Sequence, residues 1–82
     1  MVKEMLKKTL QFIVTYHTTA EAMATEKLCK ELDLPGRLIS APRNVTADCG
    51  VAWCAPVEAG PEILKALEDA KIEIDSHFEL LL

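Results

Sequence analysis

The stretch from Pro42 to Gly50 holds the residue types best suited to chemistry in this chain of 82 residues. It reads Pro-Arg-Asn-Val-Thr-Ala-Asp-Cys-Gly and lies between two short apolar runs. A thiol that follows a polar loop and precedes a glycine is open to a partner, because glycine has no side chain to block the approach. The same pattern fits a tight connection between strands that carries an incidental cysteine. These two interpretations differ in whether Cys49 has a function.

The hydrophobic pattern predicts the elements that position this stretch. Alternating apolar residues with β-branched and aromatic members indicate strands, apolar residues at spacings of three and four indicate helices, and proline and glycine mark the breaks. The predicted elements are a strand at 10–16, a helix from Thr18 or Thr19 to about Asp33 that ends at Pro35-Gly36, strands at 37–41 and 51–55, a helix from Pro61, and a last strand with Phe78, Leu80 and Leu82 on one face.

This order, β-α-β-β-α-β, predicts an α+β, ferredoxin-like domain with a four-stranded antiparallel sheet and two helices on one face. We expect residues 1–9 to be a lead-in and residues 10–82 to form the single domain. With the strand order 4-1-3-2, the end of the first strand lies beside the start of the third. Cys49 and Gly50 are therefore expected near His17 and the N-terminus of the first helix.

Composition excludes several classes of function. A net charge of −4 with scattered basic residues argues against nucleic-acid binding, which needs clustered Lys and Arg. No apolar run approaches a membrane span, and no export signal is present, so we expect a cytoplasmic protein with free thiols. His17 and Cys49 are too few ligands for a zinc site, so neither a metal nor a cofactor is predicted. We expect no enzymatic activity, because only His17 offers an acid or base near Cys49.

The remaining features have ordinary structural interpretations. The first helix should bury an apolar stripe and leave Cys29 on its flank. Cys54 lies five residues after Cys49, about 16 Å along a strand, which is too far for it to act as a resolving thiol. If Trp53 lies on the sheet face that the helices leave open, it marks a surface for a partner or a homodimer. The predicted stripe comprises Ala20, Ala24, Leu28 and Leu32.

Several of these residues together resemble the selenium/sulfur carrier-like family, over about Leu10 to Leu82. The resemblance implies a non-enzymatic carrier whose Cys49 holds sulfur or selenium as a persulfide or selenopersulfide. It also implies a donor, such as a cysteine desulfurase, and an acceptor protein. The residues that carry the resemblance are Phe12 to Thr19, Glu26-Lys27, Leu38-Ile39, Pro42-Arg43 and Asp48-Cys49-Gly50.

A carrier thiol must be partly ionised at neutral pH, and an ordinary cysteine has a pKa of about 8.5. The N–H groups that open the first helix, near Thr18 and Thr19, and the charges of Arg43 and Arg37 would each lower the pKa of Cys49. Asp48 would raise that pKa if its carboxylate converged on the thiol.

The neighbouring residues leave alternatives open. His17 would exchange a proton with Cys49 or help to bind an anion, or would only close the strand. Arg43 would bind an anionic ligand or pair with a surface carboxylate. Pro42 would fix the loop, and Gly50 would admit a donor. The alternative function is a module that binds a small anion or a partner non-covalently through Pro42–Gly50.

Overall fold

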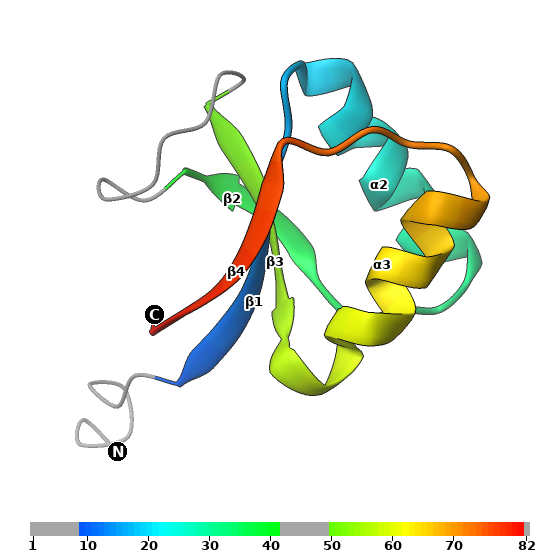
Figure 1. Ribbon diagram of the computed structural model, residues 1–82. Coiled ribbons are helices and arrows are strands. Elements are labelled where there is room, and N and C mark those ends of the chain that lie inside the picture. Colours follow the sequence, from blue (N-terminus) through cyan, green and yellow to red (C-terminus); the bar gives the residue numbers. More distant parts are fainter. Residues whose placement is uncertain (1–8, 42–49, 82) are drawn as a thin grey trace.

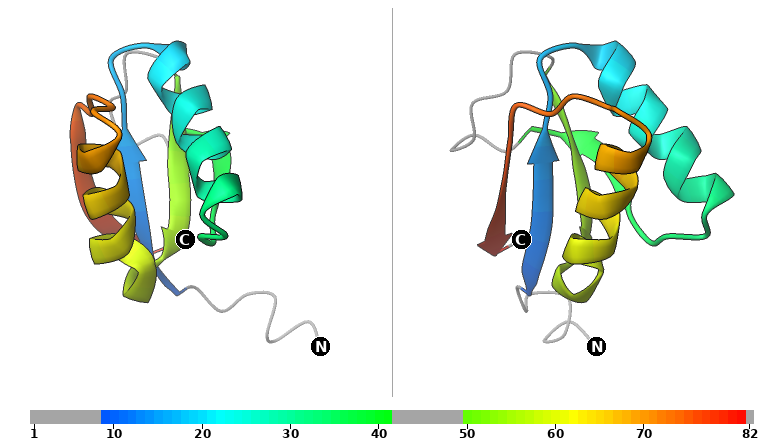
Figure 2. Two further views of the ribbon diagram at one scale, coloured as in Figure 1. Left: turned by 90° about the vertical axis from the view of Figure 1, so that its right-hand side faces the viewer. Right: turned by 45° about the vertical axis from the view of Figure 1, so that its right-hand side comes forward.

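The order of elements predicted from the hydrophobic pattern is confirmed in the computed structural model, which describes residues 9–41 and 50–81. Both helices cover the same face of a single sheet (Figures 1 and 2). The elements are β1 (Leu10–Thr15), α2 (Thr19–Glu31), β2 (Arg37–Ser40), β3 (Val51–Pro56), the 3-10 turn η1 (Val57–Ala59), α3 (Gly60–Asp69) and β4 (Ser76–Leu81).

The sheet has the strand order β2-β3-β1-β4, and every neighbouring pair is antiparallel. This is the predicted order 4-1-3-2 read from the other edge, so the ferredoxin-like α+β fold is confirmed. The central strands β1 and β3 pair from Gln11↔Pro56 to Thr15↔Ala52. Because the two strands run in opposite directions, the end of β1 lies beside the start of β3.

Alternation along β1 sends its side chains to opposite faces of the sheet. Phe12, Val14 and Tyr16 join the core beneath the helices. Ile13 faces the other way and is also fully buried, in a smaller cluster with Ala52 and Cys54. The middle of the sheet is therefore covered on both faces, which explains why the centre of β1, from Phe12 to Val14, is continuously apolar.

The predicted buried face of α2 is wrong. The residues of this helix that pack into the core are Ala22, Thr25 and Cys29. Within the predicted stripe, Leu28 is partly buried, but the other three residues are exposed. Thr25 is tolerated in the core because its hydroxyl donates to the backbone oxygen of Glu21 at 2.9 Å. Small and apolar residues occur all around α2, so its periodicity does not select one face.

Helix α2 ends before Pro35-Gly36, at a residue in the left-handed region. Asp33 has φ 60°, and the N–H of Leu34 donates to the backbone oxygen of Cys29 at 2.8 Å. This six-residue closure is a Schellman motif, and α3 ends in the same way with Lys71 at φ 59°. At the other end of α3, Pro61 lies in the first turn, as predicted.

The hypothesis that Trp53 lies on the open face of the sheet is also wrong. Trp53 is only 2% exposed and belongs to the core beneath the helices. Its cross-strand partner is Val14, and residues that pair directly point to the same face. Gly36 lies against the indole ring so closely that a Cβ atom there would be 2.5 Å from Nε1. Trp53 therefore contributes no surface to a dimer.

Candidate functional site

The end of the sheet at which β1 finishes and β3 begins is the candidate functional site. The last pair of the central strands is Thr15↔Ala52, so the chain that follows β1 and the chain that precedes β3 leave the sheet at the same end. The N–H of Ala41, just after β2, donates to the backbone oxygen of Gly50 at 3.0 Å. Figure 1 shows the connection from β1 to α2 at the same end as the start of β3. The structure therefore places Gly50, the start of β3 and the connection from β1 to α2 at the same end of the sheet.

Gly50 is exposed and has a backbone conformation that favours glycine. Its φ is +78°, and no atom of the described residues lies within 4 Å of the position that a Cβ would occupy. The absence of a side chain therefore leaves open space beside the backbone at this position. The predicted carrier thiol of Cys49 and the loop residues Pro42 and Arg43 lie outside the residues that the structure describes.

His17, Thr18 and Thr19 are exposed at this end, as a site for a partner would require. Their surroundings contain carboxylates as well as N–H donors. His17 Nε2 lies 3.7 Å from Asp75 Oδ1, and the N–H of Thr18 donates to Glu21 Oε1 at 3.1 Å. Asp75 is held there because its own N–H donates to the backbone oxygen of Thr15 at 2.8 Å.

These two carboxylates change the electrostatics expected for this end of the sheet. The macrodipole of α2 and the N–H groups at its start favour a nearby anion. Glu21 already supplies one negative charge there, and Asp75 supplies a second beside His17. Sequence reasoning missed Asp75, although its position just before the last strand and the topology together place it at this edge.

Arg37 does not belong to this site. It begins β2 and pairs with Cys54, whereas Ser40 at the other end of β2 pairs with Val51, next to Gly50. The expectation that Arg37 would help to ionise the Cys49 thiol is therefore not supported, because Arg37 lies at the far end of the strand pair.

The two described cysteines are buried and unsuited to carry a group. Cys29 is 1% exposed in the core beneath the helices, rather than on a flank of α2, and burial raises the pKa of its thiol. Cys54 is 7% exposed on the other face of the sheet. Burial also raises the pKa of the Cys54 thiol, although the charge of Arg37 opposes this shift. Both thiols are free, and neither has the exposure that sulfur transfer requires.

Neither a metal cluster nor a membrane-spanning helix occurs in the parts of the chain that the structure describes. Across residues 9–41 and 50–81, no three His, Cys, Asp or Glu side chains gather as metal ligands would. Across the same residues, no helix has the length and apolar character to cross a bilayer.

Comparison with known protein families identifies the family to which the chain belongs. Residues 11–79 match the family described as "Putative Se/S carrier protein-like". The match covers most of the chain, and the protein belongs to this family. No curated protein and no solved structure matches the chain.

Proposed function

We propose that this protein is a sulfur or selenium carrier in which the thiol of Cys49 holds the transferred atom. The observation that carries the proposal is the family match over residues 11–79, which includes Cys49. The geometry adds support, because the neighbouring Gly50 is exposed and has open space beside its backbone. The other two thiols are buried, so Cys49 is the cysteine left for this role.

The proposed loading step is a thiol–persulfide exchange. The Cys49 thiolate attacks the outer sulfur of a persulfide on a donor, a new S–S bond forms on Cys49, and the S–S bond of the donor breaks. The donor leaves as a thiolate, and the proton of the outer sulfur stays with the persulfide on Cys49. Electrons balance without an external oxidant or reductant. Unloading onto an acceptor is the same exchange in reverse, and selenium would replace the outer sulfur atom by atom.

The charges around the site favour this covalent mode over non-covalent capture of a small anion. Glu21 and Asp75 place two carboxylates near the start of α2 and the end of β1. A free anion would be repelled by both of them, whereas a covalently attached atom is held by its bond.

The proposal includes partners but no reaction catalysed by the chain itself. A cysteine desulfurase is a suitable donor class, because it presents sulfur as a persulfide, and an acceptor protein would receive it. A homodimer stays a prediction, and Trp53 does not contribute to it because that side chain is in the core.

The experiment is to incubate the reduced protein with glutathione persulfide and to read the intact mass. We expect the wild-type chain to gain the mass of one sulfur atom and to lose it on treatment with a thiol reductant. Peptide mapping should place the added atom on Cys49. The Cys49→Ser variant should gain nothing.

The matched control is the Cys29→Ala/Cys54→Ala double variant, which keeps Cys49 as its one thiol. It should load as the wild type does. Equal loading of wild type and Cys49→Ser would refute the carrier proposal. A Cys49 that alkylates at the rate of an ordinary thiol and takes no sulfur would favour the non-covalent module instead.

A further inference from the structure

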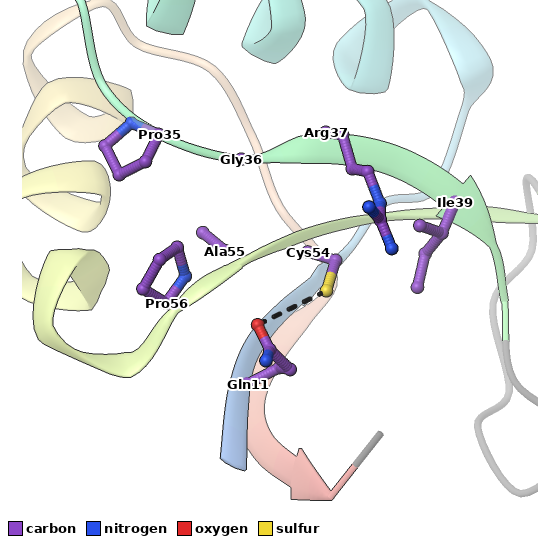
Figure 3. A pocket seen from close by; sticks show the side chains of 8 residues that line it. All are labelled: Gln11, Pro35, Gly36, Arg37, Ile39, Cys54, Ala55 and Pro56. Carbon is purple, nitrogen blue, oxygen red and sulfur yellow. Dashed lines mark hydrogen bonds between the residues drawn. The ribbon is translucent and has the colours of Figure 1, made fainter. Parts of the chain in front are cut away.

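A second thiol lies at the floor of a hollow on the sheet face that the helices leave open. Cys54 on β3, Arg37 on β2 and Gln11 on β1 approach it from three adjacent strands (Figure 3). The hollow has a volume of about 400 Å³, within the range that small-molecule sites occupy. It is separate from the candidate carrier site, because Cys54 lies four residues along β3 from Gly50, about 13 Å at the rise of a strand.

The hollow carries a net positive charge. Arg37 is the one charged residue among the described residues that line it, and no Asp or Glu contributes to its wall. Within the described part of the chain, Arg37 makes no ion pair. Arg37 is exposed, and it borders the hollow. An anionic group in the hollow would supply the missing partner.

The thiol does not cancel that charge. Burial raises the pKa of Cys54, so the group is a neutral thiol at neutral pH. Its hydrogen is directed to Gln11, because Cys54 Sγ donates to Gln11 Oε1 at 3.8 Å. The amide of Gln11 in turn donates to Thr9 Oγ1 at 2.6 Å, which fixes its orientation. The floor of the hollow is thus neutral and internally hydrogen-bonded, and the guanidinium of Arg37 remains the group available to a ligand.

The walls beside Arg37 are apolar. The side chains of Pro35, Ile39 and Pro56 line the hollow around the polar group, as Figure 3 shows. A guanidinium pairs with a carboxylate through two parallel N–H···O bonds, and apolar walls favour a ligand with an apolar body. We propose that this hollow binds a small monocarboxylate whose charged group pairs with Arg37 and whose apolar body packs between Pro35, Ile39 and Pro56.

The test is a titration of the ¹⁵N-labelled protein, followed by backbone amide shifts, with benzoate and with its neutral analogue benzamide. Benzoate should move the signals of Gly36, Arg37, Cys54 and Ala55 in a saturable way, and benzamide at the same concentration should not. Sulfate, which has the charge without the apolar body, should bind more weakly than benzoate. Equal shifts with benzamide would overturn the charge-based pairing, and tighter binding of sulfate would overturn the role of the apolar walls.

Two variants show whether Arg37 is the charged partner. Arg37→Gln should weaken benzoate binding by about tenfold or more, since a hydrogen bond to a charged group is lost. Lys30→Gln, which removes an exposed cation from α2 on the other side of the sheet, should bind as the wild type does. Arg37→Lys is the second variant, for the case in which Arg37→Gln alters the spectrum as a whole. It keeps the positive charge but loses the two parallel N–H donors of the guanidinium, so it should bind benzoate with intermediate affinity.

The same titration separates this inference from the carrier function. Cys49→Ser should bind benzoate as the wild type does, because its neighbour Gly50 lies about 13 Å along β3 from Cys54. Unchanged affinity in both Arg37 variants would refute the proposal, whatever the outcome of sulfur loading.

Discussion

At the scale of single residues, the two exposed glycines with positive φ are held for different reasons. Gly36 has φ +135°, and a Cβ there would meet the indole of Trp53 at 2.5 Å from Nε1. Gly50 has φ +78° and open space around it. Gly36 is therefore needed both for backbone conformation and for packing, whereas Gly50 is needed for backbone conformation alone.

We expect Gly36→Ala to lower the free energy of unfolding by roughly 2–4 kcal/mol, from overpacking against Trp53 and from the unfavourable φ. Gly50→Ala, the matched control, should lower it by only about 1 kcal/mol, because the φ penalty alone applies. Urea unfolding monitored by Trp53 fluorescence measures both. Equal losses in the two variants would show that the contact of Gly36 with the indole does not constrain the fold.

At the scale of elements, the rotation of α2 about its axis is the main feature that the sequence did not predict. Ala22 is fully buried against the sheet, while Ala24, two residues later, is exposed. Ala22→Leu should destabilise the protein by about 1–3 kcal/mol, because the core has no room for three further carbon atoms. Ala24→Leu should change the stability by no more than about 0.5 kcal/mol. Thermal or urea unfolding of the two variants checks this, and the opposite ranking would mean that the helix packs through its other stripe.

The sequence predicts the order of the elements well because breaks and alternation are local signals. Pro35-Gly36 and Pro61 bound the helices, and the alternation in β1 identifies its two faces. From this order, the topology places Gly50 at the end of β1. The faces of α2 and β3 are not local properties, because both segments carry apolar residues on more than one side.

Contacts with other elements determine which side chains of these segments face the core. Trp53 faces the helices because it pairs with Val14, and Arg37 lies away from the candidate functional site because it pairs with Cys54. A register between strands is set by contacts distant in sequence, and a shift of one residue would have exchanged the two faces. The carboxylate of Asp75 beside His17 likewise depends on the pairing of β4 with β1. The positions that sequence reasoning misplaced, in the strands and in α2, are those fixed by contacts with elements distant in the sequence.

At the scale of the whole molecule, the sheet keeps a buried thiol on each of its faces, Cys29 beneath the helices and Cys54 on the other side. Burial raises the pKa of both thiols in the folded state. The folded protein therefore retains these protons at a pH where the unfolded chain, with ordinary thiols, has begun to lose them. This preference for the protonated form makes its full contribution to stability below the unfolded pKa of about 8.5. It is lost as the pH rises through the folded pKa values.

We therefore expect the free energy of unfolding to fall as the pH rises above about 8.5, by at most about 1.4 kcal/mol per pH unit for each thiol. Urea unfolding in the presence of a phosphine reductant, at several values between about pH 7 and pH 10, gives the slope. Cys29→Ala and Cys54→Ala should each reduce this slope, whatever their effect on stability at pH 7. Cys49→Ser should keep the slope of the wild type. A slope that is unchanged in both alanine variants, or abolished by Cys49→Ser, would mean that the buried thiols are not the groups that link folding to alkaline pH.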